Sequence, residues 1–155
     1  TNGRAMGKIE YLFEHVFREA WSARKELRPV EGDTLAAFHK RLVTCDGLGS
    51  FMAAQVVADV KYVQPLFHAD DWWTFASSGP GSRRGLNRVL GNPPGQSWTE
   101  AKWKAQLDEL RKAVLKRLPF KLHSQDLQNC LCEFDKYERV LHGQGKPKQK
   151  YPGVR

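Results

Sequence analysis

The chain has 155 residues, of which 41% are apolar and 27% are charged. This composition excludes a disordered chain and predicts a soluble globular domain with a core of its own. No apolar run is long enough to cross a bilayer, and no secretory signal is present. We therefore expect an intracellular protein that has no membrane partner.

The formal net charge is +8, from 25 lysines and arginines against 17 aspartates and glutamates. An excess of positive charge of this size favours a polyanionic partner, and it favours nucleic acid over a membrane surface. The alternative is a basic surface that is only solvated.

The cysteines and histidines predict neither a metal site nor a cofactor. The chain has three cysteines, Cys45, Cys130 and Cys132. An odd number argues against a disulfide framework and for a reducing compartment. The cysteines lack the four-cysteine spacing of an iron–sulfur cluster, and no two of the five histidines stand four residues apart. Thr1 stands where a complete protein has Met, so the sequence is also consistent with part of a larger polypeptide.

Residues 4–27 predict one amphipathic helix, because apolar side chains recur there at spacings of three and four. We expect this stripe to lie in the core: Ile9, Leu12, Phe13, Val16, Phe17, Ala20 and Trp21. Asp33 is the expected N-cap of a second helix.

A glycine turn follows that second helix. Gly47 and Gly49 allow positive φ on both sides of Leu48, and Ser50 is placed to cap a helix from Phe51 to Lys61. The amides of Gly49, Ser50 and Phe51 then suit a phosphate oxygen, in a contact that is blind to base sequence. An ordinary turn between two helices, with glycine at the C-cap, explains the same residues and is favoured on the Gly-x-Gly alone.

Two adjacent acids, Asp70 and Asp71, come before Trp72 and Trp73. Neighbouring residues cannot share one helical face, so one acid can face a site while the other caps a short helix over residues 72–75. We favour Asp71 as the catalytic candidate and Asp70 as the cap. On local grounds, the alternative that both acids only cap helices and face solvent is equally consistent with the sequence. The tryptophans offer a face for a flipped base, although at least one is expected in the core.

A glycine-rich segment over residues 77–88 is predicted to be a loop that opens a helix ending at Gly91. Arg83, Arg84 and Arg88 supply guanidinium groups that can bind a phosphate through two hydrogen bonds each. The alternative is a flexible loop with solvated arginines.

Two further helices complete the prediction. Ser97 and Glu100 form a capping box for the first, and Ser124 caps the second. On the second, Glu133, Lys136 and Tyr137 lie at spacings of three and four and can form one polar cluster, most simply a surface salt bridge. We expect one all-α domain of about six helices over residues 1–142 and a flexible basic tail over residues 143–155.

The order Asp-Gly-Leu-Gly-Ser-Phe-x-Ala-x-Gln-Val-Val, followed by an acid 23 or 24 positions after Gly47, resembles the helix-hairpin-helix DNA glycosylase superfold. The resemblance implies a hairpin that grips the DNA backbone beside a flipped nucleotide. It also implies that Asp70 or Asp71 faces the reacting centre. Phe51 stands where lyase-active relatives carry a lysine, so we expect no lyase chemistry through an amine.

The later motifs GPGSRRGLNRVLG and QNCLCEFDKYER resemble a narrower group, the thymine-hypermodification branch. It comprises the alpha-glutamyl/putrescinyl thymine pyrophosphorylases and a helical domain joined to 5-hydroxymethyluracil DNA kinases. The resemblance covers roughly residues 41–139. By the resemblance, Glu133, Lys136 and Tyr137 belong to the branch motif. The side chains that we expect to stack on the base or line its pocket are Trp72, Trp73, Asn87, Glu133, Lys136 and Tyr137.

Together these resemblances imply a domain that acts on modified thymine in duplex DNA. The favoured hypothesis is a transferase that displaces pyrophosphate by an amine, with Asp71 as general base or charge stabiliser and the three arginines neutralising the leaving group. One alternative is a non-catalytic DNA-binding module that targets a fused kinase or oxygenase. A second is a monofunctional base glycosylase.

Overall fold

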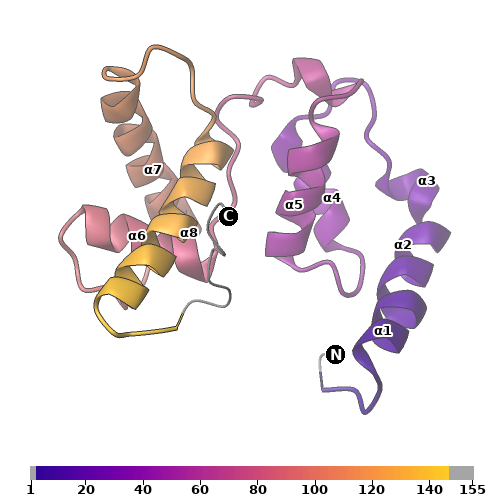
Figure 1. Ribbon diagram of the computed structural model, residues 1–155. Helices are drawn as coiled ribbons and strands as arrows, with labels where there is room; N and C mark the ends of the chain where they lie inside the picture. Colours follow the sequence, from indigo (N-terminus) through magenta and orange to yellow (C-terminus); the bar gives the residue numbers. More distant parts are fainter. Residues whose placement is uncertain (1–2, 147–155) are drawn as a thin grey trace, which may run out of the picture. The chain divides into compact units, whose positions relative to one another are not determined.

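The computed structural model describes residues 3–146, which are all-helical, without strands, in agreement with the predicted fold class (Figure 1). None of the helices in this range is both long enough and apolar enough to span a bilayer. The chain divides into two compact units, residues 1–77 and residues 78–155. We describe each unit by itself.

The first unit begins with a helical segment that changes its winding along its length. Its parts are α1 (Lys8–Tyr11), the π-helical η1 (Leu12–Phe17), α2 (Arg18–Ser22) and α3 (Arg24–Leu27). The prediction of a core stripe on one continuous helix was wrong, because four of its large side chains are between 55% and 74% exposed: Ile9, Phe13, Phe17 and Trp21.

The π-helical turns explain which face is buried. A π-helix closes hydrogen bonds between residues five apart, so it holds more residues per turn than an α-helix. Tyr11 and Val16 stand five apart and are both buried, at 7% and 5% exposure. The spacing of three and four in the sequence therefore did not mark the buried face.

The core of the first unit lies between α4 (Leu35–Val43) and α5 (Ser50–Val60), which are joined by a turn over residues 44–49. A short 3₁₀ turn, η2 (Leu66–His68), follows. The buried side chains form one apolar cluster: Leu27, Leu35, Phe38, Leu42, Cys45, Ala53, Val57, Leu66 and Phe75.

The turn between α4 and α5 requires glycine at one position. Gly47 has φ of 81°, and a Cβ added there would lie 2.5 Å from Val16 Cγ2. Gly49 has φ of −62° and open space around it, so it is not needed for a left-handed turn. The predicted glycine bend is therefore confirmed at Gly47 and wrong at Gly49.

The second unit contains α6 (Pro80–Val89), α7 (Glu100–Leu115) and α8 (Ser124–Leu141). The most extensive packing is between α6 and α8. A Cβ at Gly85 would lie 2.1 Å from the backbone oxygen of Leu131, and one at Gly81 would lie 3.3 Å from Cys132 Sγ. The glycines predicted to form a phosphate loop instead lie inside or at the start of α6, and Gly81 and Gly85 let α8 approach closely.

The predicted helix starts were correct only to within one or two residues, as is usual for helix ends. The short helix predicted over residues 72–75 is absent; Thr74 and Phe75 instead donate backbone hydrogen bonds to the Asp71 carbonyl in a turn. The N-caps found, with the predicted residue in brackets, are Thr34 (Asp33), Gly49 (Ser50), Thr99 (Ser97) and His123 (Ser124).

We expect Gly47→Ala to destabilise the first unit for two reasons: alanine disfavours the positive φ at this position, and its methyl group would press against Val16. The positive φ costs an alanine about 1–2 kcal/mol, and forcing a methyl group against Val16 adds about 1–3 kcal/mol. Gly32→Ala is the matched control, because Gly32 has φ of 80° with nothing within 4 Å. Urea unfolding of both variants should show a larger loss for Gly47→Ala, and equal losses would contradict the contact.

Candidate nucleic-acid interface

The turn between α4 and α5 forms an open depression of about 490 Å³, lined by residues 43–49. The first backbone bond of α5 runs from Ala53 N–H to Gly49 O, so the amides of Ser50 and Phe51 precede the bonded turn. The structure thus brings Gly47, Gly49, Ser50 and Phe51 to one end of the helix pair, as the sequence predicted. Ser50 and Phe51 are exposed.

The charge at this turn does not favour a phosphate. Asp46 is exposed within it, and its carboxylate lies 3.2 Å from Arg4 Nη2. His39 Nε2 lies 2.9 Å from the Ser50 carbonyl oxygen, and the Ser50 and Ser77 hydroxyls are 2.8 Å apart. A phosphate here would meet an ion pair rather than a cluster of cations.

Asp71 caps α4. Its Oδ1 accepts a hydrogen bond from Leu35 N–H at 2.7 Å, and its Oδ2 accepts one from Ala36 N–H at 2.9 Å. Both oxygens therefore satisfy amides at the start of α4, where the helix dipole also favours a negative charge. The sequence assigned the capping role to Asp70 and left Asp71 available for catalysis. The assignment of the cap is wrong, because Asp71 is the acid that binds helix amides, whereas Asp70 is exposed.

The acids and the glycine turn lie at opposite ends of α4. Asp71 is bound at the first turn of that nine-residue helix, whereas Gly47 follows its last turn. At 1.5 Å per residue, α4 separates them by roughly 13 Å. The shared groove that the sequence predicted is therefore not formed by these two features.

Of the two tryptophans, Trp72 belongs to the packed interior. Its Nε1 donates to the Lys61 carbonyl at 3.0 Å, its ring meets Tyr62 and Phe67 edge to face, and Lys61 Nζ lies 5.1 Å from its centroid. Trp73 is 36% exposed and packs edge to face on Trp72. Only Trp73 keeps a surface that a base could reach.

Arg83 connects α6 to the start of α7. Its guanidinium donates to Glu100, to the Ser78 hydroxyl and to the Trp98 carbonyl. Burial alone would raise the pKa of Glu100, but hydrogen bonds from Ser78 and Arg83 outweigh it and leave that pKa below its ordinary value. Arg83 is therefore a structural cation, occupied by one carboxylate.

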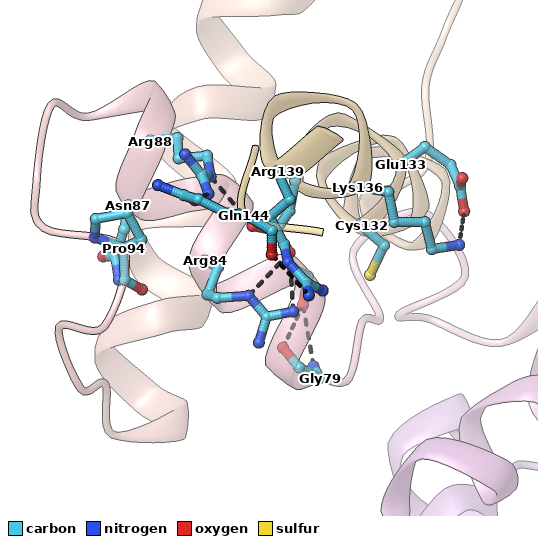
Figure 2. A network of polar contacts seen from close by, with 12 residues as sticks. Gly79, Arg84, Asn87, Arg88, Pro94, Cys132, Glu133, Lys136, Arg139 and Gln144 are labelled. Carbon is cyan, nitrogen blue, oxygen red and sulfur yellow. Dashed lines mark hydrogen bonds and ion pairs between the residues drawn. The ribbon is translucent and has the colours of Figure 1, made fainter. Parts of the chain in front are cut away.

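Arg84 and Arg88 share the carboxylate of Asp135 on α8 (Figure 2). Asp135 is fully buried, with Arg84 Nε 2.8 Å and Arg88 Nε 3.1 Å from its oxygens. Arg88 Nη2 also donates to Gln144 at 2.8 Å, and Arg139 lies 3.4 Å from the Gln144 carbonyl. Two guanidinium groups thus share one carboxylate, and the cluster keeps a surplus of positive charge.

Asn87 organises the loop between α6 and α7. It is fully buried, its amide donates to the carbonyls of Pro94 and Gln96, and its oxygen accepts from Trp98 Nε1. All its hydrogen-bonding groups are occupied within the fold. The structure thus leaves Asn87 no group to offer a base.

Glu133, Lys136 and Tyr137 are on the outside of α8. Glu133 and Lys136 pair with each other at the surface, as the simpler interpretation of the sequence predicted (Figure 2). Tyr137 is 63% exposed. Trp72 and Trp73, which the sequence placed at the same base pocket, belong to the other unit.

Asp135 is the residue that the sequence reasoning missed. It lies in the same motif as Glu133 and Lys136, but at spacings of four and eight from Leu131 and Leu127, which puts it on the apolar stripe of α8. An acid on a buried stripe needs a cation partner. The pair Arg84 and Arg88, four apart on α6, supplies it.

The net positive charge of the chain comes from the second unit. Residues 1–77 hold 9 lysines and arginines against 10 acids, a net charge of −1, whereas residues 78–155 hold 16 against 7, a net charge of +9. The electrostatic attraction for a polyanion therefore comes from residues 78–155 and not from the glycine turn.

Comparison with known families agrees with the helical fold. A family model described as the helical domain of 5-hmdU DNA kinase matches residues 4–147. The chain belongs to this family. No curated protein and no solved structure matches it. The match supports the predicted thymine-hypermodification branch, while the wider glycosylase superfold stays a prediction.

Most of the predicted tail of this helical domain, residues 147–155, lies outside the described part of the chain. The tail's first residues are held against the fold, because Gln144 accepts from Arg88. In the described range 3–146, no group of three or more histidine, cysteine, aspartate or glutamate side chains is arranged to hold a metal.

We expect Asp71→Ala to destabilise the helical domain, because it removes both acceptors from the start of α4. Thr34 remains the N-cap of α4, and losing the further acceptor that Asp71 offers to its first two amides costs about 1–2 kcal/mol. Asp70→Ala is the matched control and should change the free energy of unfolding by no more than about 0.5 kcal/mol. An Asp71→Ala variant as stable as the parent would show that the cap is unimportant and would return Asp71 to the list of catalytic candidates.

Removing Asp135 should cost much more than removing Glu133. Asp135→Ala leaves two arginines without their shared buried partner, a loss of roughly 3–5 kcal/mol. Glu133→Ala removes one member of an exposed pair and should cost less than about 1 kcal/mol. Chemical unfolding followed by helical circular dichroism measures both, and similar losses would contradict a structural role for the Asp135 cluster.

Proposed function

We propose that this helical domain is a non-catalytic DNA-binding module that holds DNA containing 5-hydroxymethyluracil for the kinase of which such a domain is part. The contact is made mainly to backbone phosphates by residues 78–155. The observation that carries the proposal is the charge division: a net charge of +9 in the second unit against −1 in the first.

The physical basis is the release of counterions from the duplex. Each phosphate neutralised by a lysine or arginine frees condensed cations, and this term supplies most non-specific affinity for DNA. The Asp135 cluster offers one such contact. Arg84 directs Nε and Nη2 to Asp135, its side chain is 36% exposed, and Nη1 remains to donate outward.

The transferase and glycosylase alternatives require an acid that can take a proton or stabilise charge at a base. Asp71, the favoured acid, uses both oxygens to cap α4. Arg83 and Arg88, the expected partners of a leaving pyrophosphate, are bound to Glu100 and Asp135. These contacts support binding over catalysis, with the chemistry left to the kinase.

The glycine turn is a second and weaker contact in this proposal. Its free amides at the start of α5 suit one phosphate, as in the helix-hairpin-helix elements that the sequence resembles. The Arg4 and Asp46 pair there adds no net charge. A single sequence-blind contact of this kind positions the DNA without providing most of the affinity.

Binding to fluorescent duplexes across a salt series tests the proposal. We expect log K to fall linearly with log salt concentration. Arg84→Gln should reduce that slope by about 0.9, the value for one duplex phosphate, while Arg84→Lys keeps it. The control Arg18→Gln removes one exposed charge from the first unit and should leave the slope unchanged.

Two results would contradict the module. A binding constant insensitive to salt, or an equal effect of Arg18→Gln and Arg84→Gln, would remove the second unit as the DNA-binding surface. Turnover of pyrophosphorylated or hydroxymethylated DNA by the purified domain, abolished by Asp70→Asn or Asp71→Asn in a folded variant, would establish the transferase instead.

A further inference from the structure

The end of α7 and the connection to α8 form the most cationic stretch of the described chain. Residues 110–125 contain no acid, and they carry five cations: Arg111, Lys112, Lys116, Arg117 and Lys121. The nearest acids along the sequence are Glu109 and Asp126. This run belongs to the unit that holds the positive charge of the protein.

Lys112 and Arg111 are used by the fold. Lys112 pairs with Asp108 and Glu109, and these bonds raise its pKa well above the ordinary range. Arg111 Nε donates to the Leu122 carbonyl at 2.8 Å, which fastens the end of the connection to α7. Lys116 and Arg117 are exposed, and within residues 3–146 neither forms an ion pair.

An aromatic ring stands between these cations. Phe120 is 59% exposed in the turn that follows Leu115, the last residue of α7. Pro119 fixes the backbone before it, and His123 at the far side is 7% exposed, so it is anchored in the fold. The ring is therefore held outward on a short turn that is tied at both ends.

We propose that residues 116–121 form a base-stacking contact with DNA. Lys116 and Arg117 bind neighbouring backbone phosphates, and the ring of Phe120 stacks on a base or enters a base step. Exposed aromatic rings flanked by cations bind nucleic acids in this way, because every base has a face on which a ring can stack. This inference rests on the proposed DNA-binding function and names the part of the surface that touches bases.

DNA is favoured over an anionic membrane as the partner. A membrane anchor needs a broad apolar face beside its cations, whereas this turn offers one large exposed ring and its neighbour Leu118 is half-buried. A stacking ring also suits a kinase whose target group is on a base. An enzyme that acts on a base often unstacks it, and an aromatic side chain can occupy the space that is left.

Affinity measurements with Phe120→Ala test the stacking. We expect the dissociation constant to rise about five- to a hundred-fold, the range for losing one ring from a base, with an unchanged salt slope because no charge is lost. Phe13→Ala is the matched control, since Phe13 is 60% exposed in the first unit. It should leave affinity unchanged, and both variants should unfold at the parent temperature.

The double variant Lys116→Gln with Arg117→Gln tests the phosphate contacts. The salt slope on duplex DNA should fall by about 1.8, for two phosphates at 0.9 each. The same change at Lys25 and Arg28, two exposed cations of the first unit, is the control and should have little effect.

The outcomes separate this inference from the proposed function. If the parent domain binds DNA but both sets of turn variants bind as tightly, the stacking contact is wrong and the module stands. If the parent does not bind DNA in a salt-dependent way, the module itself fails. Loss of binding by Phe120→Ala to phosphatidylserine vesicles, with DNA affinity intact, would assign the turn to a membrane.

Discussion

The second unit depends on one buried carboxylate. Asp135 is fully buried, and a charge in that position is tolerated only when it is paired and hydrogen-bonded. Arg84 and Arg88, one helical turn apart on α6, meet it together, and Gly85 between them has no side chain to hold α8 away. Because two cations share one anion, the contact that joins α6 to α8 also leaves positive charge at the surface.

The sequence was sufficient to predict the helices of the fold but not all of their faces. Periodicity and caps located α4, α5, α6, α7 and α8 to within a few residues, because these signals are local. The segment over residues 8–27 failed because a π-helical section changes the angle between successive side chains, and apolar spacing cannot show this. Its exposed rings, such as Phe13 and Trp21, were placed in the core for that reason.

The roles of the charged residues were harder to predict, because each is decided by a partner far away in the chain. Asp71 caps a helix that begins 36 residues earlier, and Arg84 meets Asp135 across 51 residues. A local motif shows that a carboxylate or guanidinium is present, whereas packing decides whether it faces solvent or another charge. The pattern of α8 did contain the signal for Asp135, since an acid on an apolar stripe implies a buried partner.

The charge division separates affinity from recognition. Phosphate contacts fix the position of DNA but carry no information on the bases, so in the proposed function the net charge of +9 in the second unit would attract any duplex. Discrimination of a modified base therefore needs a group that reaches the base itself. Of the predicted pocket residues, Asn87 and Trp72 are taken up by the fold. Under the proposed function, selectivity would come from an exposed ring, such as Trp73, Tyr137 or Phe120, that can sense how easily a base leaves the stack, or from the active site of the kinase.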